Sequence, residues 1–151
     1  MASSGAASSQ PAAKGRVLIV DDEEGIRDLL KAVLERDYHV SEAESGAALH
    51  QALDHQQPDV VLLDMKLPDA NGLGLLPAIK QRWPATEVIV LTGQPNDGGA
   101  ASWASEAVNS GAFRLIAKSA GLDLQKLLDG IGLAVARCQQ TLGNSSLRLR
   151  G

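Results

Sequence analysis

Residues 17–22 read Val-Leu-Ile-Val-Asp-Asp, a short apolar run that ends abruptly in two acids. A β-branched apolar run of this length is typical of a strand that is buried on both faces of a parallel sheet. A helix is expected directly afterwards, because apolar residues recur at helical spacing over residues 26–34. Asp22 is expected to cap that helix, and Glu23 and Glu24 suit the positive end of its dipole. The stretch therefore predicts one β-strand followed by one α-helix.

The same alternation repeats along the chain. Further strands are expected at residues 39–43, 59–64, 87–92 and 115–118, and helices at 47–55, 73–83, 100–110 and from 123 onward. Parallel strands need crossover connections, and helices supply them on both sides of the sheet. The chain therefore predicts an α/β fold, a doubly wound five-stranded parallel sheet with helices on both faces. Ligands of such sheets bind beyond the carboxyl ends of the strands.

Length and composition indicate one soluble domain. The chain has 151 residues, of which 44% are hydrophobic, and a net charge of −4. That charge argues against direct contact with nucleic acid or an anionic membrane surface, because both are bound by clustered Lys and Arg. No run approaches the ~20 apolar residues of a membrane-spanning helix. The single cysteine, Cys138, cannot form an internal disulfide, so the expected location is the cytoplasm.

Three segments are expected along the chain. Residues 1–15 are mostly Ala and Ser near the start and are interpreted as a disordered leader. Residues 16–137 contain the alternating strands and helices and are interpreted as the folded domain. Residues 138–151 are interpreted as a helical extension or a linker, and they carry no helix-turn-helix or catalytic signature.

Four of the predicted strands end in polar residues that share one edge of the sheet. These residues are Asp21 and Asp22, Asp64, Thr92 and Lys118. Each alone has an ordinary explanation, such as a helix cap, a turn or a solvated charge. Together, the three carboxylates would repel one another by about 1 kcal/mol or more per pair unless a cation held them. Mg²⁺ prefers such hard oxygen ligands and leaves positions for a phosphoryl oxygen. The pattern predicts phosphoryl chemistry with Asp64 as the nucleophile.

The motifs around these residues resemble the receiver domains of two-component response regulators, the CheY-like superfamily. The resemblance covers residues 16–137. The motifs that carry it are VLIVDDE at 17–23, VVLLDMKLPD at 60–69 with Asn71-Gly72, Leu91-Thr92-Gly93, and Gly111-Ala112 followed by Lys118. It implies the flavodoxin-like strand order 2-1-3-4-5.

The resemblance also implies a role for each residue at the sheet edge. Asp64 would be the phosphoacceptor. Asp22 and Asp64 would bind Mg²⁺ directly together with the main-chain carbonyl of Lys66, and Asp21 would hold the metal through water. Thr92 and Lys118 would contact the phosphoryl group. The Lys66 side chain, two residues after Asp64, is hypothesised to alter the rate at which the phosphoryl group is hydrolysed.

Partners follow from the same resemblance. The donor would be a phosphohistidine on a sensor histidine kinase or on a histidine phosphotransfer protein. A conformational shift would then be recognised by an output domain or effector, which the sequence does not identify. The chain is not expected to be a turnover enzyme, and the final helix with its neighbouring strand is a possible homodimer surface.

Three positions depart from the family pattern. Leu115 stands where an aromatic residue is usual, three places before the lysine, and Phe113 is a poor substitute although it is expected on the same side of the strand. Ser119 stands where a proline usually follows the lysine. Residues 93–110 are longer than usual and rich in small residues, with Trp103 among them.

Three alternative functions are weighed against phosphorylation. The departures at Leu115 and Ser119 suit a receiver-like interaction module with weak or absent phosphorylation. A Mg²⁺-dependent phosphatase of the haloacid-dehalogenase type shares much of the site, but it needs a second aspartate where this chain has Lys66. A flavin or nucleotide module is disfavoured, because the acids after the first strand would repel phosphate.

Overall fold

The computed structural model describes residues 14–92, 107–117 and 123–150, with the side chains of residues 92, 117 and 144–150 left out. Its elements are β1 (Arg16–Val20), α2 (Glu24–Leu34), β2 (His39–Ala43), α3 (Gly46–His55), β3 (Val60–Asp64), α4 (Gly72–Arg82), β4 (Glu87–Thr92), β5 (Ala112–Ala117) and α6 (Leu124–Arg150). Residues 107–109 are also helical. Most of these bounds lie within one or two residues of the predicted ones.

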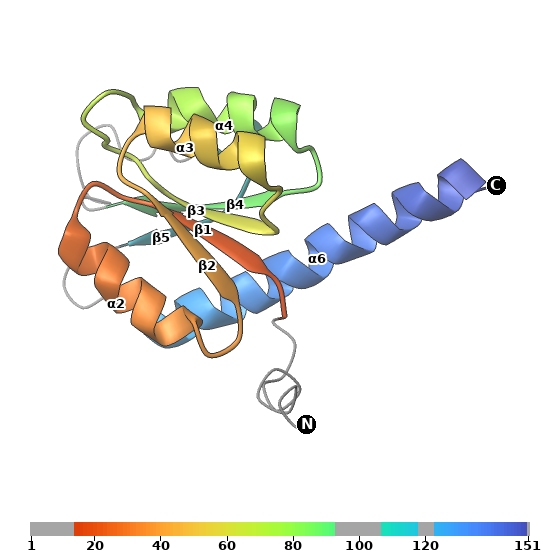
Figure 1. Ribbon diagram of the computed structural model, residues 1–151, viewed down its shortest axis with the longest axis horizontal. Helices are drawn as coiled ribbons and strands as arrows, with labels where there is room; N and C mark the ends of the chain where they lie inside the picture. Colours follow the sequence, from red (N-terminus) through yellow and green to blue (C-terminus); the bar gives the residue numbers. More distant parts are fainter. Residues whose placement is uncertain (1–13, 93–106, 118–122, 151) are drawn as a thin grey trace, which may run out of the picture.

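The five strands form one parallel sheet in the order β2-β1-β3-β4-β5. This confirms the predicted fold class and strand order. In Figure 1, α3 and α4 cover one face of the sheet, and α2 and α6 cover the other. Strands β1 and β3 are neighbours at the centre of the sheet. After β1 the chain continues to β2 on one side, and after β3 it continues to β4 on the other side. Ligands of such sheets bind where the direction of winding reverses in this way.

Alternate residues of each central strand enter two separate apolar cores. On β1, Leu18 and Val20 pack beneath α3 and α4, whereas Val17 and Ile19 pack beneath α2 and α6. All four are at most 2% exposed. Successive side chains of a strand point to opposite faces, so burial on both faces requires an unbroken apolar run. This is the physical reason that residues 17–20 are apolar throughout.

Strand β5 differs from the prediction because it begins at Ala112, three residues before the expected start at Leu115. Its pairing with β4 is irregular: Val88 faces Ala112 and Ile89 faces Arg114, so Phe113 is an extra residue in the ladder. Such a bulge changes which face the flanking side chains enter. Phe113 packs on the α6 side and Leu115 on the α3–α4 side. The expectation that these two residues share a side was wrong.

Helix α6 is a single element of 27 residues, Leu124–Arg150. Among residues 124–143, whose side chains the structure describes, the fully buried positions include Leu127, Ile131 and Ala134 and extend to Cys138. Residues 139–143 are exposed, and Figure 1 shows the helix continuing beyond the sheet. Within the described ranges, none of the helices combines the length and apolar character required to cross a membrane.

Candidate functional site

Asp21 and Asp64 meet because of the register between the two central strands. Val20 of β1 lies opposite Leu63 of β3, so the next residue on each strand is one of the two acids. Asp21 is 0% exposed and Asp64 is 5% exposed. The parallel arrangement brings both to the carboxyl edge of the sheet, as the sequence predicted.

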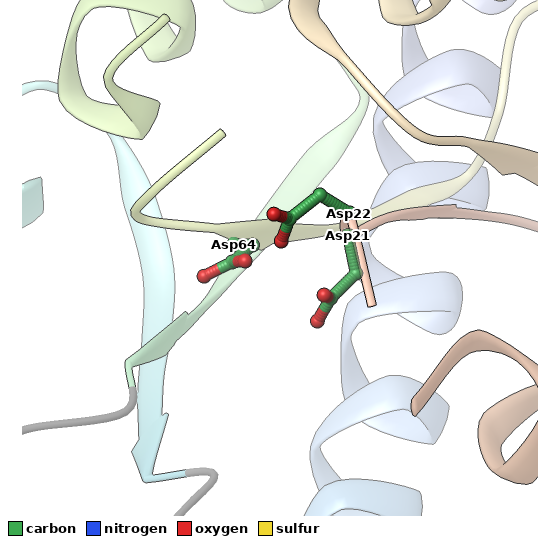
Figure 2. Close-up of side chains that lie close together, drawn as sticks. All are labelled: Asp21, Asp22 and Asp64. Atoms are coloured by element: carbon green, nitrogen blue, oxygen red, sulfur yellow. The ribbon is translucent and has the colours of Figure 1, made fainter. Parts of the chain in front are cut away.

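Asp22 completes a cluster of three carboxylates, which Figure 2 shows gathered at the ends of β1 and β3. Each aspartate offers one oxygen, and the three oxygens lie within 4.8 Å of one another, although Asp22 itself is exposed. Ligands on opposite sides of one Mg²⁺ are about 4.2 Å apart, since each bond is about 2.1 Å long. The donor set therefore fits Mg²⁺ after small rotations, or with one carboxylate acting through water.

Each of the two buried acids is oriented by the backbone just after it. Asp21 Oδ1 accepts a hydrogen bond from the amide of Glu23 at 2.9 Å, and Asp64 Oδ1 accepts one from the amide of Lys66 at 3.3 Å. Turns of this kind favour Asp, because its short side chain reaches the amide two residues later. The same bonds place the main chain of Lys66 beside the cluster, while its side chain is exposed.

The predicted cap of the first helix is wrong. Helix α2 begins at Glu24, its N-cap residue is Glu23, and that residue makes no capping bond with its side chain. Asp21, rather than Asp22, accepts the hydrogen bond from the Glu23 amide. Asp22 therefore has no capping bond in the described structure that would explain its place beside two other acids.

Arg27 was missed by sequence reasoning. Its Nη1 donates to the main-chain oxygen of Asp21 at 2.7 Å, and its Nε donates to Glu42 Oε1 at 3.2 Å. The side chain is only 14% exposed. Arg27 thus fastens the end of β1 to β2. A single Arg on the polar side of a helix carries no signal of this in the sequence, since it looks like any solvated charge.

Gly72 is required by the close approach of α4 to the end of β3. A Cβ atom at this position would lie 2.6 Å from the main-chain oxygen of Asp64 and 3.0 Å from Met65 Cα. Any side chain would push α4 away from the end of β3. The Asn71-Gly72 pair, part of the motif noted in the sequence, therefore sets the start of α4 against the site, and Asn71 also caps the helix through Leu73.

Thr92 and Lys118 are placed only in part. Thr92 is the last residue of β4, one position beyond Leu91, which pairs with Asp64. Its backbone also pairs with Ala117, the residue before Lys118. The Thr92 side chain, Lys118, Ser119 and Trp103 lie outside what the structure describes. Leu115 is half-buried against the core beneath α3 and α4.

Comparison with known proteins points to one family. The sequence profile described as response regulator receiver domain matches residues 17–131. The DNA-binding transcriptional regulator NtrC of Proteus hauseri is 35% identical over 111 residues, which are 73% of this chain and 23% of that protein. A protein-glutamate methylesterase/protein-glutamine glutaminase of Desulfitobacterium hafniense is 34% identical over 142 residues, or 89% of this chain and 36% of that protein.

A solved structure agrees with the sequence relatives. The crystal structure of a response regulator receiver domain protein from Clostridium thermocellum has a TM-score of 0.73 and 32% identity, covering 83% of this chain and 98% of that one. By contrast, the chain spans only about a quarter to a third of the length of the two curated relatives. The match is therefore to one domain of those longer proteins.

Proposed function

The chain belongs to the response regulator receiver domain family of two-component signalling, and on that basis we propose that Asp64 is its phosphoacceptor. The observation that carries the proposal is the position of Asp64. It ends the central strand β3, is 5% exposed, and lies in a cluster with Asp21 and Asp22 within 4.8 Å. Receiver domains bind Mg²⁺ at an acidic pocket of this kind.

The transfer forms one bond and breaks one bond. A carboxylate oxygen of Asp64 attacks the phosphorus of a phosphohistidine, the new O–P bond forms, and the P–N bond to the departing imidazole breaks. Hydrolysis reverses the state: water attacks the phosphorus, the O–P bond breaks, and inorganic phosphate leaves with the carboxylate restored. Asp64 thus accepts the phosphoryl group and loses it again by hydrolysis, and the domain does not turn over a separate substrate.

The residues of the cluster are assigned different roles in binding Mg²⁺. Asp22, Asp64 and the main-chain carbonyl of Lys66 are assigned as direct ligands, and Asp21 as a ligand through water. When bound, Mg²⁺ offsets the negative charge that develops on the phosphoryl oxygens. The hydrogen bonds from Glu23 to Asp21 and from Lys66 to Asp64 keep both carboxylates aimed at the sheet edge.

Thr92 and Lys118 are assigned to the phosphoryl group itself. Thr92 ends the strand beside β3, and Lys118 directly follows the residue that pairs with Thr92. A hydroxyl donates one hydrogen bond to a phosphoryl oxygen, and an ammonium pairs with a second oxygen as a point charge. The exposed Lys66 side chain is the third candidate for contact with the phosphoryl group.

Partners are assigned by the chemistry of the transfer. The proposed donor is a sensor histidine kinase or a histidine phosphotransfer protein, and the proposed domain is residues 16–137. Phosphorylation then controls an output domain or effector, with no direct contact between this domain and nucleic acid. Homodimer formation is included in the proposed response. The cytoplasm is the proposed location, in keeping with the free thiol of Cys138.

Thermal unfolding tests the phosphoacceptor assignment. The Tm of the chain is measured alone, with Mg²⁺, and with Mg²⁺ plus beryllofluoride, which imitates the phosphoryl group. A ligand that binds only the folded site at 100 times its Kd stabilises by about 2.7 kcal/mol. We expect both additions to raise Tm, and Asp64→Asn to remove the beryllofluoride effect. If neither addition raises the Tm of the natural chain, the phosphoacceptor assignment is wrong.

A receiver-like interaction module remains the second candidate, favoured by Leu115. That residue is half-buried and aliphatic where the family usually places an aromatic switch residue, so a phosphoryl signal has a smaller side chain to move. A rise in Tm with Mg²⁺ and none with beryllofluoride would favour this candidate over phosphorylation.

A further inference from the structure

The loop between β3 and α4, residues 65–71, is closed on itself. Lys66 and Asn71 form an isolated antiparallel bridge, and the Leu67 amide donates to the Ala70 oxygen at 3.1 Å. The Gly72 amide donates to the Met65 oxygen at 2.9 Å. These bonds give the loop a defined shape. Its position in the domain also depends on contacts that it makes with other elements.

Asp69 fastens this loop to the start of a different helix. Its Oδ1 accepts a hydrogen bond from the Gly46 amide at 2.8 Å, and its Oδ2 accepts one from the Ala47 amide at 3.1 Å. These are amides of the first turn of α3, which helices leave without partners of their own. The hydrogen bonds from the Gly46 and Ala47 amides lower the pKa of Asp69 below its usual range, so the side chain is charged at neutral pH.

Helix α3 is a firm support for the loop. Leu49 and Leu53 on its inner side are at most 2% exposed and belong to the core beneath α3 and α4. The contact is also close, because a Cβ atom at Gly46 would lie 3.1 Å from Ala70 Cβ and 3.2 Å from Asp69 Oδ1. Any side chain at position 46 would press against the loop and disturb the two hydrogen bonds.

We propose that Asp69 is a positioning residue for the metal site, because its bonds to α3 hold the loop that presents the Lys66 carbonyl. The inference rests on the proposed function, which makes that carbonyl a ligand of Mg²⁺. Asp69 lies five residues after Asp64 and does not enter the cluster of three aspartates. It acts through the loop: the carboxylate fixes α3 to Asp69, and the Lys66–Asn71 bridge carries that constraint to Lys66.

Ser45 provides a matched control. Its side chain accepts a hydrogen bond from the Ala48 amide at 3.1 Å, so it caps the same helix without contacting the loop through that bond. If Asp69 were only a helix cap, Ser45→Ala and Asp69→Ala would have the same consequences. If Asp69 positions the loop, only Asp69→Ala affects Mg²⁺. Asp69→Asn keeps one acceptor oxygen and should recover part of the effect.

Magnesium affinity is the first measurement. Mg²⁺ is titrated calorimetrically into the natural chain, Asp69→Ala, Asp69→Asn and Ser45→Ala. We expect Asp69→Ala to weaken Mg²⁺ binding about tenfold, as loss of a supporting residue behind a ligand does. Asp69→Asn should weaken it less, and Ser45→Ala should leave it unchanged. The inference is overturned if Asp69→Ala binds as the natural chain does, or if Ser45→Ala is weakened equally.

Amide hydrogen exchange without Mg²⁺ is the second measurement, and it separates this inference from the proposed function. The amides of Leu67 and Gly72 should exchange faster in Asp69→Ala than in Ser45→Ala, because the loop has lost its support. Equal exchange in the two variants overturns the inference while leaving the phosphoacceptor assignment intact. Failure of the natural chain to bind Mg²⁺ overturns both.

Discussion

Glu87 and Asp64 are nearly buried carboxylates at opposite edges of the same sheet, 8% and 5% exposed. At the amino edge, Glu87 lies 3.6 Å from Lys80 Nζ on α4 and 3.0 Å from Arg137 Nε on α6. At the carboxyl edge, Asp64 lies among other aspartates. Acids at the first edge join helices to the sheet, and acids at the second gather negative charge in one place. Ion pairs stabilise the fold at the amino edge, and the proposed phosphorylation site lies at the carboxyl edge.

The largest expected effect is the loss of phosphorylation in Asp64→Asn, compared with a substitution at the amino edge. It removes the proposed nucleophile, so labelling by a small phosphoryl donor such as acetyl phosphate should be lost completely. The measurement is separation of phosphorylated from unmodified chain on a phosphate-affinity gel. Asp59→Asn, at the amino edge, should still be labelled. Equal labelling of the natural chain and Asp64→Asn would show that the acceptor lies elsewhere.

The thiol of Cys138 is buried beside the acids of the amino edge. Burial, followed by the nearby Asp59 and Glu87 carboxylates, raises its pKa from 9.0 to about 12. The neutral thiol is thus favoured by folding, and the stability this provides is lost as pH rises through the folded pKa. At pH 8 the folded chain should hold about a thousandfold less thiolate than an ordinary cysteine, with alkylation by iodoacetamide slowed in proportion.

The control for this thiol is Asp59→Asn, which removes the charge 3.8 Å from the sulfur. Alkylation of the folded variant should be faster than that of the natural chain, and both should react alike in urea. Rapid alkylation of the folded natural chain would contradict the burial of Cys138 and its raised pKa.

Glu87→Gln tests the fastening role of the amino edge. The change removes the negative charge that forms ion pairs with both Lys80 and Arg137, and we expect a loss of about 1–2 kcal/mol in the free energy of unfolding. Most of the loss should come through Lys80, because the Arg137 side chain is 66% exposed and its pair is screened by water. Urea unfolding measures it, with Glu35→Gln on the surface as the control; equal losses in both variants would contradict the assignment.

Asp22→Asn should have the smallest effect and the opposite sign. Without Mg²⁺, removal of one of three clustered charges should stabilise the chain by up to about 1 kcal/mol. With Mg²⁺, the variant should gain less stability than the natural chain, because it has lost a ligand. Urea unfolding in both conditions checks the reversal, and Asp28→Asn on α2 is the matched control. A destabilised metal-free variant would mean that Asp22 has a structural role.

The buried strands and their order could be predicted from the sequence. Residues 17–20 and 60–63 are apolar on both faces, and only a parallel sheet with two covered faces accommodates that. The start of β5 could not be predicted, because Arg114 interrupts its apolar run. Arg114 lies beside α6. The Cζ atoms of Arg114 and Arg137 are each 5.7 Å from the centroid of the Phe113 ring. A bulge leaves no mark in composition.

The site was predictable where it depends on strand ends and unpredictable where it depends on distant contacts. Asp21, Asp22 and Asp64 follow from strand ends and come together through register alone. Asp69 read as an ordinary turn residue, and only the fold shows that its carboxylate reaches Gly46, 23 positions earlier. Turn composition predicts that the chain bends, and it does not indicate which helix the turn meets.

Helix α6 extends beyond the sheet, so a small tilt of the helix moves its far end by a larger distance. Its Gln139 Nε2 donates a hydrogen bond to Asp59 Oδ2 at 3.1 Å, and the helix continues to Arg150. Eleven more residues at 1.5 Å each place the end of the helix about 16 Å beyond Gln139. A tilt of about 10° at Gln139 therefore moves Arg150 by about 3 Å. A small change in how the helix packs against the sheet is therefore enlarged along the part of the helix that extends beyond the sheet.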